Sequence, residues 1–235
     1  MKLKEIIHKV YAVNIDSDIA IKKLSIDSRE IDSGDCFVAV KGERFDGADY
    51  IENAIASGAV AVIVASEVFF ESVRSNTKVV VVGLPDLATK LGNLAAAFYS
   101  FPSRDMNVVG VTGTNGKSSM VYLLAAALKF IKKKSAFIGT MGYGDVDNYN
   151  YATRTTEMAI KLQHMFSQLS EKKFSHVAME VSSHGISQHR IVGVDFNGLI
   201  FTNISGDHLD YHGDIASYAE TKLSIFKREG LDIII

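Results

Sequence analysis

Residues Val108–Met120, VVGVTGTNGKSSM, lead from an apolar strand through a glycine-rich turn into a helical pattern. In such a turn the backbone N–H groups bind phosphate oxygens, a lysine reaches the terminal phosphates, and a serine or threonine holds Mg²⁺. The strict motif would have its first glycine at Val111, whereas this sequence has Gly110, so a glycine-rich turn with an incidental lysine is the alternative. The phosphate-loop interpretation gives seven candidate nucleotide-binding residues: Gly113, Thr114, Asn115, Gly116, Lys117, Ser118 and Ser119.

Short apolar runs alternate with helical patterns after this loop. Strands separated by crossover helices indicate an open α/β sheet of parallel strands. The chain ends on GLDIII, a strand-like run, and a sheet domain that stops inside a strand predicts a fragment of a longer enzyme. The expected strands cover 107–112, 135–140, 176–182 and 198–205, and the expected helices cover 118–131 and 159–172.

The same kinds of element precede the loop and predict a separate, smaller domain. We place the boundary at about residue 88. This gives an N-terminal α/β domain of residues 1–88 and a P-loop-type parallel-sheet domain of residues 89–235, incomplete at its C-terminal end. The first domain has expected strands at 35–40, 59–65 and 78–83, and expected helices at 50–58 and from about residue 86.

Composition limits the classes of protein to consider. The chain is 47% hydrophobic and 22% charged with a net charge of −2, so no global positive field attracts nucleic acid or anionic lipid. The lone Cys36 suits a reducing compartment, and no apolar run approaches the roughly 20 residues of a membrane span. We expect a cytoplasmic monomer that binds neither nucleic acid nor membrane.

Polar side chains follow two of the predicted strands. Glu180 ends the strand HVAME, and Asp207–His212 follows another strand end. Ligands gather at the carboxyl ends of parallel strands, so Glu180 is a candidate ligand for a nucleotide-bound Mg²⁺, with a solvated acid as the alternative. Four of the seven histidines lie between His184 and His212. His208 and His212 have the spacing of a zinc pair, but Leu209 removes the general base of that motif.

Three further positions carry less information by themselves. Arg190 could bind a carboxylate or phosphate through both of its terminal nitrogens, or it could form a surface salt bridge. From spacing alone Lys222 is an ordinary solvated lysine of a helix, and Thr155–Thr156 belongs to a loop without a predicted task. These patterns predict a Mg²⁺-dependent, nucleotide-using α/β enzyme and nothing narrower.

Several stretches together resemble the Mur ligases of bacterial peptidoglycan synthesis, and within that family the MurE type. The similarity extends over nearly the whole chain, because residues 25–64 resemble the domain that holds the uridine nucleotide. The stretches that resemble the family's central motifs are GVTGTNGKSS at 110–119, MEVSSHGISQHR at 179–190, FTNISGDHLDYHG at 201–213 and YAETKLSIF at 218–226.

The resemblance implies roles for individual residues. Lys117 and Ser118 would bind the ATP phosphates and Mg²⁺, Glu180 and His208 would ligate Mg²⁺, and Lys222 would be carbamylated to hold a second Mg²⁺. Lys117, Lys222 and His208 are therefore the implied catalytic residues. Ser28 would contact the uridine end of the substrate. The implied contacts to the muramoyl-dipeptide part are Asn115, Thr155, Thr156, Ser182, Gln188 and Arg190.

The implied reaction is an ATP-dependent ligation. The D-Glu carboxylate of UDP-MurNAc-L-Ala-D-Glu attacks ATP to give an acyl phosphate, and the amine of meso-diaminopimelate or L-lysine then displaces phosphate. Glu157 departs from the family, because a proline usually follows the threonine pair. The family's uridine loop varies, so Glu43–Arg44 receives no role. The alternatives are another Mur-type or folylpolyglutamate-type ligase, and a catalytically incomplete remnant that binds nucleotide or muropeptide precursor.

Overall fold

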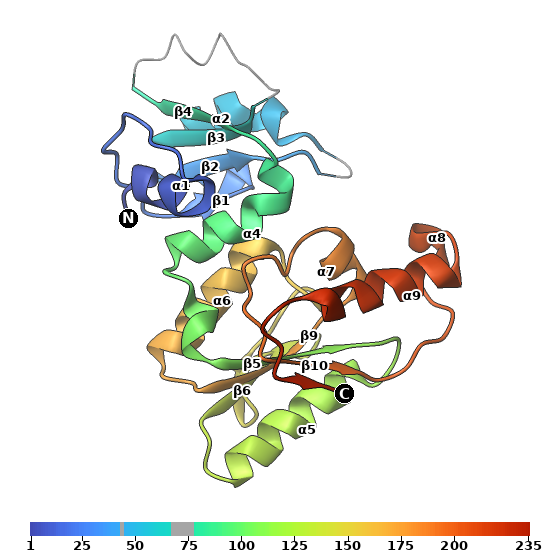
Figure 1. The fold of residues 1–235 in the computed structure, drawn as a ribbon. Helices are drawn as coiled ribbons and strands as arrows, with labels where there is room; N and C mark the ends of the chain where they lie inside the picture. The colour runs from blue at the N-terminus through green and yellow to red at the C-terminus, as the bar shows by residue number, and fades with distance from the viewer. Residues whose placement is uncertain (43–44, 67–77) are drawn as a thin grey trace. The chain divides into compact units, whose positions relative to one another are not determined.

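Apolar strands form two separate sheets in the computed structural model, which describes residues 1–42, 45–66 and 78–235 (Figure 1). The chain divides into two compact units, Met1–Phe98 and Tyr99–Ile235. This division follows helix α4 (Leu87–Phe98), whereas the predicted boundary after residue 88 lies near the start of that helix. That boundary stays a prediction about the functional domains. The uridine-loop pair Glu43–Arg44 lies outside the described residues.

The first unit contains a four-stranded parallel sheet in the order β1-β2-β3-β4. Strands β2 and β3 are buried along almost their whole length, which explains why their sequences read as continuous apolar runs. The elements are α1 (Leu3–Tyr11), β1 (Leu24–Ser25), η1 (Ser28–Glu30), β2 (Cys36–Ala39), η2 (Gly47–Tyr50), α2 (Ile51–Ala56), β3 (Ala61–Ala65), β4 (Val80–Leu84) and α4.

The second unit contains a seven-stranded sheet in the order β11-β10-β5-β9-β6-β7-β8. Strand β5 therefore lies between β9 and β10, and the loop that follows it opens at the carboxyl edge of the sheet. The strands are β5 (Asn107–Thr112), β6 (Ser135–Gly139), β7 (Gly142–Asp145), β8 (Asn148–Asn150), β9 (His176–Glu180), β10 (Gly198–Phe201) and β11 (Ile233–Ile234). The helices are η3 (Pro102–Asp105), α5 (Lys117–Phe130), α6 (Ala159–Glu171), α7 (Ser183–Ser187), α8 (Leu209–His212), α9 (Ile215–Leu223) and η4 (Ser224–Lys227).

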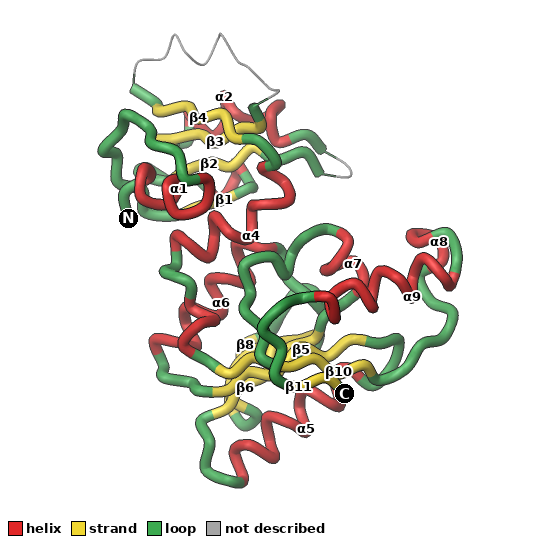
Figure 2. Tube along the Cα trace, in the orientation of Figure 1, coloured by secondary structure: helices red, strands yellow, loops and turns green. Residues whose placement is uncertain are grey.

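Helices cover both faces of this sheet (Figure 2). Helix α5 packs on one face through Val121 and Ala125, and α6 packs on the other through Leu162 and Phe166. Strand β5 is buried from both sides, so apolar side chains occupy both faces of it. The α/β class is confirmed, with a parallel sheet in the first unit and a mostly parallel sheet in the second. No described helix has the length and apolar character needed to cross a membrane.

The expectation of parallel strands throughout is wrong at one edge, where β7 and β8 form an antiparallel hairpin against β6. A Cβ atom on Gly142 would lie 2.2 Å from the carbonyl oxygen of Asn150, so the close approach of the two strands requires glycine there. The sequence GYGDVDNYN has turn residues and few apolar ones. It therefore gave no strand signal, although two short strands form.

Candidate functional site

The phosphate loop lies between β5 and α5, and two of its glycines are required by its geometry. Gly113 has a φ of 139°, and a Cβ atom there would lie 2.0 Å from Thr202 Oγ1. Gly116 precedes α5 with a φ of 83°, in the left-handed region that glycine adopts without strain. The free N–H groups of the first turn of α5 follow at once, and Ser118 and Ser119 lie on that turn. This is the arrangement that binds phosphate oxygens.

The segment after β10 holds the loop in place. Asn203 forms a reciprocal pair with Asn115, because its Oδ1 accepts from Asn115 N at 3.1 Å and its Nδ2 donates to Asn115 O at 3.0 Å. Thr202 Oγ1 also donates to Asn115 O, at 2.7 Å. Thr114 N donates to the backbone oxygen of Asn203. Sequence reasoning did not select Asn203, because it lies inside the expected strand 198–205, whereas β10 ends at Phe201.

Two lysines converge on one carbonyl oxygen of the loop. Lys117 Nζ donates to Gly113 O at 2.9 Å and to Thr114 O at 2.7 Å, and Lys222 Nζ donates to Gly113 O at 2.8 Å. Lys222 is only 1% exposed, so the interpretation of this residue as a solvated lysine is wrong. It lies one helical turn after Tyr218 on the inner face of α9, and its ammonium group lies 4.6 Å from the centre of that ring.

Burial and charge lower the pKa values of both lysines. For Lys222, desolvation and the neighbouring Lys117 lower the pKa from 10.5 to about 8. The pKa of Lys117 is lowered by burial, while the carboxylates of Glu180 and Asp207 act in the opposite direction. Asp207, which sequence reasoning did not select individually, therefore acts on both lysines. A lowered pKa gives a buried amine a larger neutral fraction at neutral pH than an ordinary lysine has, and a neutral amine is a nucleophile.

Glu180 lies at the same edge of the sheet, at the end of β9. It is paired in register with Val111 of β5 and is 1% exposed. Its Oε1 accepts from Thr140 N at 2.8 Å, and Thr140 Oγ1 donates to Thr155 Oγ1 at 3.0 Å. The ends of β5, β6 and β9 therefore bring the predicted metal ligand and one predicted substrate residue to one place. Thr140 is the last residue of the expected strand 135–140, so the strand-end rule could have found it.

Histidine and tyrosine rings form a cluster. They come from α7, from α8 and from the segment that joins β10 to α8. The ring of His184 has its centre 4.8 Å from that of His208, 4.3 Å from that of Tyr211 and 5.8 Å from that of His212. His208 has a φ of 53° and precedes α8, so His208 and His212 do not form an i, i+4 pair on one helical face. Within the described residues no group of three or more His, Cys, Asp or Glu side chains could hold a metal. The zinc alternative is therefore unsupported.

The donor set at the strand ends suits magnesium bound through a nucleotide. Mg²⁺ prefers oxygen ligands and is usually held by one or two carboxylates together with substrate phosphates. Glu180 supplies a carboxylate and Ser118 a hydroxyl group next to the phosphate loop. Half of the His208 side chain is exposed, and its Nε2 lies 3.5 Å from Asp207 Oδ2. The ammonium form of Lys222 has no free electron pair and Mg²⁺ prefers oxygen ligands, so the predicted metal role of Lys222 requires the carbamate.

Four of the residues predicted to contact the muramoyl-dipeptide are joined by hydrogen bonds. Thr156 Oγ1 donates to the backbone oxygen of Glu180 and accepts from Ser182 N, both at 3.0 Å. Arg190 donates through Nη1 to Thr156 O at 2.9 Å and through Nη2 to Gln188 Oε1. Thr155 joins this group through Thr140, and Asn115 lies in the phosphate loop. The structure thus brings these residues to one edge of the sheet.

Ser28 belongs to the first unit and is described by itself. It begins η1 and is 8% exposed, and the preceding Asp27 caps this short helix by accepting from Arg29 N at 3.0 Å. Its predicted contact to uridine stays a prediction.

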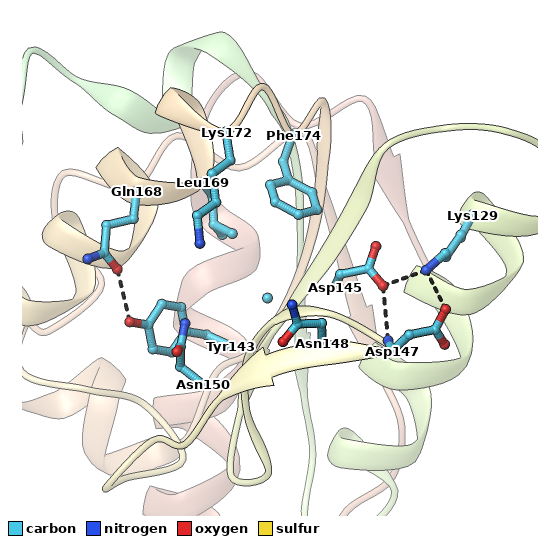
Figure 3. A pocket seen from close by; sticks show the side chains of 11 residues that line it. Lys129, Tyr143, Asp145, Asp147, Asn148, Asn150, Gln168, Leu169, Lys172 and Phe174 are labelled. Atoms are coloured by element: carbon cyan, nitrogen blue, oxygen red, sulfur yellow. Dashed lines mark hydrogen bonds and ion pairs between the residues drawn. The ribbon is translucent and has the colours of Figure 1, made fainter.

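A separate open cavity of about 370 Å³ lies beside the β7–β8 hairpin (Figure 3). Lys129 binds Asp145 at 2.5 Å and Asp147 at 2.7 Å at its rim, and Tyr143 donates to Gln168 at 2.9 Å. None of the predicted site residues lines this cavity. The chemistry predicted from the sequence therefore belongs to the strand ends and not to this cavity.

Comparison with known protein families gives two matches. The model of the Mur ligase middle domain matches residues 111–235, more than half of the chain. The model described as the Mur ligase family catalytic domain matches residues 20–99.

Individual relatives agree with these matches. The UDP-N-acetylmuramoyl-L-alanyl-D-glutamate–2,6-diaminopimelate ligase of Coxiella burnetii is 40% identical over 217 residues, which are 92% of this chain and 44% of that protein. The enzyme of the same name from Pseudomonas aeruginosa is 39% identical and covers the same shares. The chain thus spans less than half the length of these curated relatives.

Solved structures show the same fold. A UDP-N-acetylmuramoyl-L-alanyl-D-glutamate–2,6-diaminopimelate ligase superimposes with a TM-score of 0.79 at 27% identity, over all of this chain and 47% of the other. A MurF ligase from Thermotoga maritima in complex with ADP has a TM-score of 0.58 at 26% identity, over 90% of this chain and 44% of the other. The predicted resemblance is confirmed, and the chain belongs to the Mur ligase family.

Proposed function

We propose that this chain holds the ATP site and the UDP-muramoyl-peptide site of a ligase that adds a diamino acid to UDP-MurNAc-L-Ala-D-Glu in peptidoglycan precursor synthesis. The names of the relatives favour diaminopimelate over L-lysine as that diamino acid. The observation that carries the proposal is the convergence of Lys117 and Lys222 on Gly113 O, at the strand edge where Glu180 ends β9. We expect the reaction to take place in the bacterial cytoplasm, with the chain acting as a monomer.

The proposed chemistry has two steps. The D-Glu carboxylate attacks the γ-phosphorus of ATP, which forms a C–O–P bond and releases ADP. The amine of the diamino acid then attacks the acyl carbon, and phosphate leaves with the electron pair of the broken C–O bond while the amine loses a proton. The first step brings two anions together, so positive charge and positioning between them lower the barrier.

The residues at the strand ends suit these needs. Lys117 and the N–H groups of the first turn of α5 would bind the phosphates, and Arg190 would bind an anionic group of the peptide. Mg²⁺, when bound through Ser118, Glu180 and His208, would neutralise phosphate charge. Hydrogen bonds already orient Arg190 and Glu180. Less reorganisation is therefore needed when the substrates bind.

The environment of Lys222 favours the predicted carbamate. Carbamate formation joins the neutral amine to CO₂ through a new N–C bond and releases one proton. The lowered pKa of about 8 raises the neutral fraction of this amine relative to an ordinary lysine. The carbamate would replace a positive charge by a negative one next to Lys117. This change removes the repulsion between the two lysines and creates an oxygen ligand for a second Mg²⁺.

Calorimetric titration of the folded chain tests the proposal. Circular dichroism first establishes that the sample is folded, and UDP-MurNAc-L-Ala-D-Glu and ATP with Mg²⁺ are then titrated separately. Saturable heat with both ligands is the expected result. Binding of ATP without binding of the UDP-peptide would refute the substrate assignment, and binding of neither ligand by a folded chain would refute both sites.

A further inference from the structure

Glu157 is a buried carboxylate in the loop between β8 and α6 that the proposed mechanism does not use. It is 2% exposed. Its Oε1 accepts three hydrogen bonds: from Thr153 N at 2.7 Å, from Thr153 Oγ1 at 2.7 Å and from Lys161 Nζ at 3.0 Å. Lys161 also donates to Thr153 Oγ1, at 3.1 Å. The carboxylate thus joins the beginning of the loop to the first turns of α6.

The loop between these attachment points is short and carries Thr155 and Thr156. Its far end is fixed by the hydrogen bonds that Thr156 makes with the strand end at Glu180 and with Ser182. A Cβ atom on Gly185 would lie 2.7 Å from Thr156 Cγ2, so α7 also packs tightly on this end. Glu157 therefore holds the near end at Thr153, and Thr155 lies between this point and the fixed Thr156.

The charge of Glu157 strengthens this attachment. Burial raises its pKa, but the hydrogen bonds from Thr153 and the interaction with Lys161 outweigh burial, so the pKa is lowered overall. The group is a carboxylate at neutral pH. Hydrogen bonds to a charged acceptor are stronger than those between neutral groups, and an unpaired charge in a buried place is costly. Replacement of Glu157 should therefore release Thr153.

We propose that Glu157 is a positioning residue, whose carboxylate holds Thr153–Thr156 in the conformation that binds the UDP-muramoyl-peptide. The inference rests on the proposed function, because Thr155 and Thr156 are the substrate contacts that it would position. It adds to that function a residue that touches no substrate atom and acts only through the loop. Loss of Glu157 should consequently weaken the UDP-peptide and leave ATP binding unchanged, because the phosphate loop is held by Asn203 and not by this segment.

The first measurement follows the loop itself. Amide hydrogen exchange of Thr153 is compared in the unmodified chain, Glu157→Ala, Glu157→Gln and the control Glu171→Gln, which replaces an exposed glutamate at the end of α6. Exchange of Thr153 should accelerate about tenfold or more in Glu157→Ala, less in Glu157→Gln because the amide oxygen still accepts, and not at all in the control. Unchanged exchange of Thr153 in Glu157→Ala would overturn the proposal.

The second measurement separates positioning from a general loss of stability. Affinities for UDP-MurNAc-L-Ala-D-Glu and for ATP are measured by calorimetry on the same variants. We expect about a tenfold weaker UDP-peptide complex in Glu157→Ala, partial rescue in Glu157→Gln, and unchanged ATP affinity. Equal loss for both ligands, or no loss for the UDP-peptide, would overturn the inference while the proposed function stands. No UDP-peptide binding by the unmodified chain would instead refute the proposed function.

Discussion

Replacement of Lys222 by methionine should make the folded chain more stable at neutral pH and remove part of its pH dependence. Lys222 is 1% exposed, and its pKa is lowered from 10.5 to about 8, so the folded state resists holding this proton. The unfolded state keeps the ordinary pKa and binds more protons between these two values. The buried charge of Lys222 therefore lowers the stability of the folded state below about pH 8. This cost disappears as the pH rises from about 8 to 10.5.

The magnitude follows from the shift. A difference of about 2.5 pKa units corresponds to roughly 3 kcal/mol, of which roughly 2 kcal/mol is recovered between pH 7 and pH 10. The Lys222→Met variant keeps the apolar stem and loses the charge, so it should gain roughly 1–3 kcal/mol at pH 7 and lose most of that advantage at pH 10. This sign is opposite to the one expected for a stabilising salt bridge.

Urea denaturation at pH 7 and pH 10 measures both effects. The buffers are degassed, because CO₂ could convert the amine to its carbamate. The matched control is Lys133→Met, at an exposed lysine, where no change of pH dependence is expected. The difference in unfolding free energy between Lys222→Met and the unmodified chain could be the same at both pH values. The charge of Lys222 would then cost the folded state no stability. Lys222 would then not be a favoured site of carbamate formation.

Three further predictions concern the phosphate loop, and all are measured by calorimetric titration with ATP and Mg²⁺. Gly113→Ala places a Cβ atom 2.0 Å from Thr202 Oγ1 at a φ of 139°, so ATP affinity should fall at least about tenfold; unaltered affinity would mean that the loop relaxes without cost. Asn203→Ala removes both hydrogen bonds to Asn115 and should weaken ATP by about tenfold, whereas an effect on the UDP-peptide alone would contradict its assigned role. Lys117→Ala should lower ATP affinity by about a hundredfold, and a fully retained affinity would remove the phosphate-loop assignment.

The sequence predicted those features whose physical cause is local. Val108–Thr112 is a buried strand because both faces of it are apolar, and the loop after it contains glycines at the two positions that need a positive φ. The strand-end rule likewise put Glu180 beside the loop, because parallel strands in one sheet end at the same edge. These inferences needed no knowledge of distant contacts.

Features that depend on distant contacts were missed or misjudged. Lys222 has no local sign of burial, since α9 buries it only because the phosphate loop lies against its inner face. Asn203 is an ordinary polar residue until its pairing with Asn115, far away in the sequence, is known. Glu157 departs from the family pattern, and its compensating partners Thr153 and Lys161 become evident only from the folded loop.

The register of the sheet determines where residues can be inserted into this chain without displacing the site. Glu180 and the phosphate loop are placed by strand pairing, Val111 with Glu180 and Thr112 with Phe201, so their positions do not depend on the turns at the other ends of the strands. The exposed turns at 131–134 and 172–173 lie at those other ends. Inserted residues, tags or fluorescent labels should be tolerated there, whereas a single added residue between β9 and α7 would displace Ser182 from Thr156. One edge of the domain is therefore open to modification, and the other is fixed in length.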